Sequence, residues 1–173
     1  MEENLQEEIS VVFRRLLPLL SSLLFLLISY MPMNYLVVGA NVKLMVGFIC
    51  VYFWLLHRPD LFSLGSICVL GLFEDVLSSA PFGSNLFALL MLYVLVHNLS
   101  TFFNAKPFIF IWYGFAMLVF AVLFAKWLLI SIYYSQFLPI MPILFSYLFT
   151  VAFYPLFSLI NAFVQNAFIG DDI

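Results

Sequence analysis

Charged residues are scarce in this chain. Asp, Glu, Lys and Arg make up 9% of its 173 residues, whereas a typical soluble domain carries about 25%. So few charges could not cover the surface of a soluble domain of this length. The six basic residues are scattered and form no patch that would hold nucleic acid. The composition therefore excludes a soluble enzyme, a nucleic-acid-binding domain and a disordered protein.

Residues that carry catalysis or bind metals are also few. Cys50 and Cys68 both lie inside apolar runs, which predicts small core side chains rather than a disulfide. The two imidazoles, His57 and His97, are expected near the opposite side of the membrane from Glu74 and Asp75. The sequence contains no His-Glu-x-x-His or Gly-x-Ser-x-Gly motif. We therefore expect no enzymatic activity, no metal and no cofactor.

Apolar residues, by contrast, fill most of the chain. They make up 66% of it, about 114 side chains, and the mean hydropathy is +1.16. A transmembrane helix takes about 20 apolar residues, so six such helices need about 120. This near match predicts an all-α integral membrane protein with six transmembrane helices and very little chain outside the bilayer.

Proline, glycine and polar clusters divide the apolar sequence into segments. Residues 1–15 are expected to be a cytoplasmic N-terminal segment, either an amphipathic helix on the membrane surface or a frayed tail. Residues 16–165 are expected to be the transmembrane domain, and 166–173 a short acidic cytoplasmic tail. The predicted spans are 16–31, 36–56, 61–78, 83–103, 108–133 and 137–163. The first span is long and lacks a small-residue cleavage site, so we expect an uncleaved anchor.

Four basic residues orient these spans. With six crossings, Arg14, Arg15, Arg58 and Lys106 all fall on one side, and the connections on the other side carry no Lys or Arg. The positive-inside rule places both termini in the cytoplasm. In the last span, Pro155 removes one backbone hydrogen bond, so the carbonyl it frees needs a partner inside the membrane.

Four charged residues remain inside apolar runs. Lys43, Lys126, Glu74 and Asp75 are all expected in one layer in the outer half of the membrane, about 5–10 Å deep at a rise of about 1.5 Å per residue. Two interpretations stay open. The four form an ion-paired cluster, or the lysines snorkel outward while the acids lie in an interfacial loop. Because the two acids are about 100° apart on a helix, we expect only Asp75 to point inward.

Residues 51–93 carry a recognisable pattern. An aromatic-rich apolar stretch ends in His57-Arg58-Pro59-Asp60, and Gly71-Leu72-Phe73-Glu74-Asp75-Val76-Leu77 and Pro81-Phe82-Gly83 follow it. This order resembles the MreD family of rod shape-determining membrane proteins, which have a Gly-Leu-x-x-Asp-x-Leu element followed by a Pro-x-Gly turn. The close match covers about a quarter of the chain. The pattern departs from the family at Glu74, a second acid, and at residues 39–43, which lack a proline.

The resemblance implies a fold and a set of partners. The family fold is similar to the six-helix substrate-binding subunits of energy-coupling-factor transporters. By resemblance, the chain would be a non-enzymatic scaffold in the bacterial cytoplasmic (inner) membrane. It would associate with MreC, MreB and the peptidoglycan synthases of the rod complex, and with membrane lipid.

The motif residues also have physical roles of their own. Asp75 could cap the start of the span that follows it, or it could contact a ligand or partner. Pro81 and Gly83 predict a tight turn, and Gly65 and Gly71 a thin helix surface for close approach. Ala121 and Ala125 form a small-xxx-small pair that we expect to serve internal packing.

The alternative function is a small-solute-binding or transport subunit, with the charged layer lining an outward-facing pocket.

Overall fold

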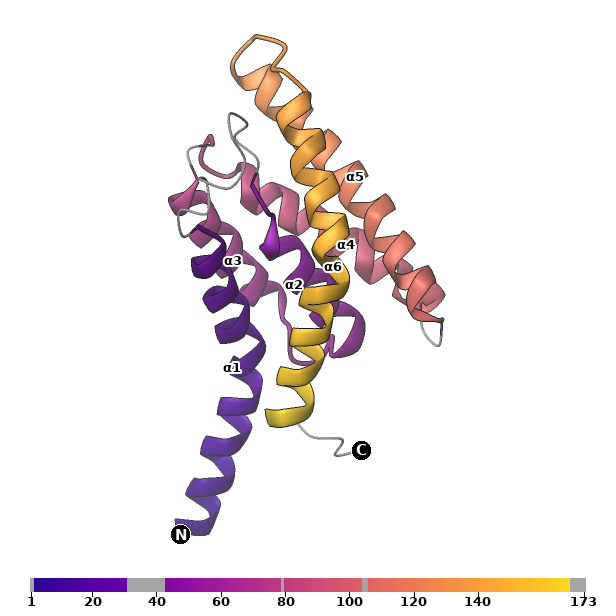
Figure 1. The fold of residues 1–173 in the computed structure, drawn as a ribbon. Helices are drawn as coiled ribbons and strands as arrows, with labels where there is room; N and C mark the ends of the chain where they lie inside the picture. Colours follow the sequence, from indigo (N-terminus) through magenta and orange to yellow (C-terminus); the bar gives the residue numbers. More distant parts are fainter. Residues whose placement is uncertain (1, 31–42, 79, 104–105, 169–173) are drawn as a thin grey trace.

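The computed structural model describes residues 2–30, 43–78, 80–103 and 106–168, and all regular structure among them is helical (Figure 1). The helices are α1 (Glu2–Tyr30), α2 (Val46–His57), α3 (Leu64–Leu77), α4 (Ser84–Phe103), α5 (Phe108–Tyr133) and α6 (Met141–Phe168). The prediction of an all-α fold is confirmed. α1 begins and α6 ends at the same end of the bundle (Figure 1).

Helix α2 forms the centre of the bundle. Its residues Val46–Leu55 are all buried, and it packs against α1, α4 and α6. A helix that is apolar around its whole circumference has no face for water, so it must be enclosed by other helices. Trp54, Tyr52 and Phe48 are the bulkiest of its fully buried side chains.

Helices α5 and α6 are built differently. They contain the segments Phe108–Tyr133 and Met141–Ala167, which are long and apolar enough to cross a membrane. Many of their large apolar side chains are exposed, among them Met117, Ile132 and Phe163, each at least 74% exposed. The described residues thus contain two helices with the dimensions of a membrane span. The larger number of six transmembrane helices stays a prediction.

The N-terminal segment and the first predicted span lie in one continuous helix, residues 2–30. The expected boundary near residue 15, between a cytoplasmic segment and the transmembrane domain, stays a prediction. Pro18 is accommodated inside this helix, and the Ser22 hydroxyl donates a hydrogen bond to its carbonyl at 2.7 Å. At the other end, α6 continues to Phe168, past the predicted boundary at residue 165. Residues 169–173, most of the predicted acidic tail, lie outside the described residues.

The second predicted span is helical over only part of its length. Helix α2 begins at Val46, and residues 43–45 before it are not helical. Residues 36–42 of that prediction lie outside the described residues. Hydroxyl groups replace the missing helical hydrogen bonds of this segment: Lys43 N donates to Ser146 Oγ at 3.0 Å, and Met45 N donates to Thr150 Oγ1 at 3.1 Å. A neighbouring helix, α6, can therefore hold non-helical backbone in place, which hydropathy alone does not predict.

The carbonyl freed by Pro155 has the partner that we expected. Proline leaves the carbonyl four residues earlier, that of Val151, without its helical donor. The Trp112 indole Nε1 of α5 donates to this oxygen at 2.9 Å. The carbonyl that the proline in α6 frees is thus bonded by a side chain of the neighbouring helix.

Candidate functional site

Asp75 caps the start of α4. Its Oδ2 accepts hydrogen bonds from Gly83 N at 2.9 Å and from Leu86 N at 3.3 Å, and its Oδ1 accepts one from Asn85 N at 2.9 Å. The first N–H groups of a helix have no partner within the helix, and a carboxylate there satisfies them and complements the helix dipole. This geometry is the capping role proposed from the sequence. Both carboxylate oxygens of Asp75 are thereby occupied by its own chain.

The turn and the helix contact around Asp75 depend on two glycines. Gly83 has φ +92°, a left-handed conformation that glycine adopts without strain. Ser84 N donates to Pro81 O at 3.1 Å, which closes the turn before α4. A Cβ on Gly71 would lie 2.7 Å from Leu86 Cα, so α3 and α4 approach closely at this point. Gly71, Asp75, Pro81 and Gly83 thus form one structural unit.

Asn85 connects this unit to α5. Its side-chain Nδ2 donates to Ser78 Oγ at 2.8 Å, and its Oδ1 accepts a short hydrogen bond from Lys126 Nζ. We call Glu74, Asp75, Ser78, Asn85 and Lys126 the polar corner; these residues come from α3, its C-terminal end, α4 and α5. An amide can join a carboxylate cap to a lysine because it offers both donors and an acceptor.

Glu74 is also buried, contrary to the prediction that only Asp75 points inward. The two acids are 4% and 3% exposed. They face different neighbours, since Asp75 turns toward α4 while Glu74 turns toward the first turn of α2. A Cβ on Gly47 would lie 2.9 Å from Glu74 Oε2, so the missing side chain of Gly47 makes room for the carboxylate. Glu74 Oε2 has no hydrogen-bond partner among the described residues.

The ion-paired cluster, one of the two interpretations left open for the lysines and the acids, is not formed among the described residues. In the described part of the chain, no salt bridge joins Lys43 or Lys126 to Glu74 or Asp75. Lys126 bonds to Asn85 instead. Lys43 lies in the non-helical segment before α2, is exposed, and has its ammonium 5.6 Å from the centroid of the Tyr30 ring. The depth expected for Lys43 assumed that it lies in a helix, and that assumption is wrong because residues 43–45 are not helical.

The other motif residues have local roles. Leu61 N donates to Arg58 O at 3.1 Å, which places Pro59 second in a tight turn, and Arg58 Nε lies 3.6 Å from Asp60 Oδ1. Gly65 is not a close-approach position, because a Cβ there would meet only Ser63 Oγ, at 3.6 Å. The two cysteines are free, as predicted.

The prediction that Ala121 and Ala125 serve packing inside the bundle is wrong for Ala121. Ala121 is exposed on α5, whereas Ala125 is half-buried. The pair therefore does not form a seam inside the bundle.

Sequence reasoning missed Asn85, Gly47 and Trp112. The sequence could have pointed to Asn85, since it is a polar residue in the first turn of a helix otherwise rich in apolar residues. It could not have pointed to Gly47 and Trp112, because their roles depend on which helices become neighbours.

Comparison with known proteins found no match to a family model, a curated protein or a solved structure.

The hydrogen bonds of the polar corner link neighbouring helices. Its carboxylate cap has both oxygens occupied, its lysine is bonded to an amide, and the described residues contain no group of three or more His, Cys, Asp or Glu side chains that could hold a metal ion. Such an arrangement can fix the positions of α3, α4 and α5 relative to one another.

Proposed function

We propose that the chain is an integral membrane protein whose six helices cross the bacterial cytoplasmic membrane, with both termini in the cytoplasm. The length and apolar character of α5 and α6 support this proposal. The alternation of Arg14, Arg15, Arg58 and Lys106 with uncharged connections supports the even number of crossings.

The hydrogen bonds made by non-helical and proline-freed backbone groups also support the membrane proposal. In hydrocarbon, every backbone polar group needs a partner within the protein. The hydroxyls of Ser146 and Thr150 bond the non-helical segment before α2, and Trp112 bonds the carbonyl that Pro155 frees. These are the positions at which water would otherwise have to enter.

Within that membrane, we propose a non-enzymatic scaffold of the cell-elongation (rod) complex that helps to maintain cell shape. It would couple peptidoglycan synthesis to MreB and MreC. The resemblance of residues 51–93 to the MreD family is the basis of this proposal. One observation carries it: Gly71, Asp75 and Gly83, which make the resemblance, act together in one capped and closely packed junction of α3 and α4.

A scaffold without an exposed domain binds its partners through helix faces and short loops. Affinity capture of the tagged chain from the native membrane tests the proposal. We expect MreC and peptidoglycan synthases in the captured material, and less of both with Asp75→Ala at an equal amount of membrane-inserted protein. Capture that lacks every component of the elongation complex would contradict the scaffold function.

A second candidate is a small-solute-binding subunit. Glu74 favours it, because a buried carboxylate oxygen without a partner is a group that a ligand could satisfy. Thermal unfolding of the purified protein with a panel of small vitamin-like solutes distinguishes the two functions. Stabilisation that depends on Glu74 would favour solute binding, and no stabilisation by any solute would favour the scaffold.

A further inference from the structure

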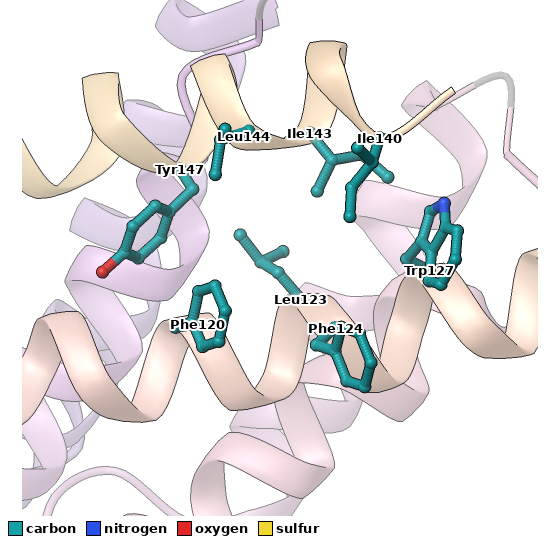
Figure 2. Close-up of a pocket in the computed structure, with 8 residues that line it drawn as sticks. All are labelled: Phe120, Leu123, Phe124, Trp127, Ile140, Ile143, Leu144 and Tyr147. Carbon is teal, nitrogen blue, oxygen red and sulfur yellow. The ribbon is translucent and has the colours of Figure 1, made fainter. Parts of the chain in front are cut away.

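A hollow lies between α5 and α6, and none of its lining residues belongs to the polar corner. It has a volume of about 120 Å³, and eight side chains from α5, α6 and the residue just before α6 converge on it (Figure 2). Leu123, 3% exposed, forms its floor. Phe120, Phe124 and Leu144 form its walls and remain 40–53% exposed, so the hollow is open toward the outside of the bundle.

The hollow offers no polar group to a ligand. Only two of its lining side chains carry polar atoms, Trp127 and Tyr147, and both are already bonded. Trp127 Nε1 donates to Leu138 O at 3.2 Å, and Tyr147 OH donates to Ala116 O at 3.2 Å. Every remaining lining side chain is hydrocarbon. Apolar walls of this kind favour apolar occupants: an enclosed cavity of about 150 Å³ lined by Leu, Ile and Phe binds benzene.

The size of the hollow selects a slender occupant. Its lining on the α6 side extends from Ile140, just before the helix, to Tyr147, a length of about 10 Å at about 1.5 Å per residue. A helix with its side chains is about 10–12 Å in diameter and could not enter. A single hydrocarbon chain could, and the medium around α5 and α6 would supply one if these helices cross a bilayer.

We propose that the hollow between α5 and α6 binds one acyl chain of a membrane lipid. The geometry requires recognition of the chain rather than of the headgroup, since no charged or free polar group lines the hollow. This inference depends on the membrane-spanning part of the proposed function and is independent of the cell-elongation part.

Photolabelling from within the bilayer tests the inference. The full chain is reconstituted in phosphatidylglycerol vesicles that contain a small amount of the same lipid with a photoactivatable acyl chain, and labelled residues are mapped by mass spectrometry. We expect Phe120, Leu123 and Leu144 to be labelled several-fold more strongly than Met117, which is 78% exposed on α5 outside the hollow. Phosphatidylcholine with the same labelled chain should give the same pattern.

A matched pair of substitutions makes the test specific. Leu144→Phe fills part of the hollow, whereas Leu148→Phe makes the same change one turn further along α6, at a residue that is 53% exposed and does not line it. Leu144→Phe should lower labelling of Phe120 and Leu123 about fourfold, the factor that one buried methylene group contributes. Leu148→Phe should leave labelling unchanged, and Leu144→Ala, which enlarges the hollow, should keep it at the wild-type level or above.

Several results would overturn the inference. Equal labelling of the hollow residues and Met117 would show a bilayer contact without a site. Equal loss in both phenylalanine variants, a dependence on the headgroup, or crosslinks between two copies in place of lipid label would exclude an acyl chain as the occupant. Absence of label from both helices would contradict the membrane-spanning proposal as well, so failure of the two proposals can be told apart.

Discussion

The polar corner and the α5–α6 pair differ in what holds their helices together. In the corner, Asp75 and Asn85 join α3, α4 and α5 by directional hydrogen bonds among buried groups. The α5–α6 pair is held by apolar contacts, with single side-chain donors such as Trp112 at intervals along it. A buried polar network tolerates little change because each lost partner leaves an unsatisfied group. The comparison teaches that substitutions in the corner should cost more stability than those between α5 and α6.

The largest effect is expected for Asp75→Ala. It removes the acceptor of three backbone N–H groups at the start of α4, so the free energy of unfolding should fall by about 3 kcal/mol. Denaturant unfolding of the purified protein in detergent measures this change. Asp60→Ala is the control, since Asp60 is 62% exposed in a surface ion pair and should change stability by less than about 1 kcal/mol. Equal stability of the two variants would remove the distinction between the corner and the surface.

Gly71→Ala is expected to have the next largest effect. Its Cβ would meet the backbone of Leu86 at 2.7 Å, so α3 and α4 would have to separate at a cost of about 2 kcal/mol. The matched control is Gly65→Ala on the same helix, where the space is open and alanine should be neutral or stabilising by up to about 1 kcal/mol. Thermal unfolding of both variants checks the pair. A Gly71→Ala protein as stable as Gly65→Ala would show that the helices do not touch there.

The two lysines should respond differently to the same change. Lys126→Leu leaves Asn85 Oδ1 without its donor and should cost about 1.5 kcal/mol. Lys43→Leu removes an exposed side chain that has no salt bridge to Glu74 or Asp75, and should stay within about 0.5 kcal/mol of the wild type. Unfolding midpoints of the two variants, measured in one detergent, compare them directly. A larger loss of stability for Lys43→Leu than for Lys126→Leu would favour the ion-paired cluster instead.

Between α5 and α6 we expect an effect smaller than that of Lys126→Leu. Trp112→Phe leaves the Val151 carbonyl unsatisfied and should cost about 1 kcal/mol. Pro155→Ala restores a backbone N–H four residues after Val151, so in that background Trp112→Phe should cost less. A double-mutant cycle measures this coupling. Strict additivity would mean that the indole does not substitute for the missing helical donor.

The sequence predicted the helical parts of the fold well where apolar runs were long and clearly bounded. The fifth span was predicted as 108–133, and α5 is Phe108–Tyr133. The helix prediction was wrong just before α2, where Ser146 and Thr150 hold non-helical backbone from more than one hundred residues away. Hydropathy is a local average, so it cannot register hydrogen bonds made by a distant helix.

The candidate site shows the same limit. The capping role of Asp75 could be predicted because the acid, the turn and the next helix are close in sequence. The hydrogen bond between Lys126 and Asn85 could not, since Coulomb attraction alone favours a carboxylate over an amide as the partner of a lysine. The Asp75 oxygens were already taken by backbone N–H groups, and the amide was the acceptor within reach.

The most direct test of the account is the shape of cells from which the chain has been depleted. If the chain is the proposed scaffold of the elongation complex, depleted cells should become wider and rounder. Wild-type chain should restore the rod, and Gly65→Ala should restore it better than Gly71→Ala. Depleted cells that keep the length and width of undepleted cells would contradict the proposed function.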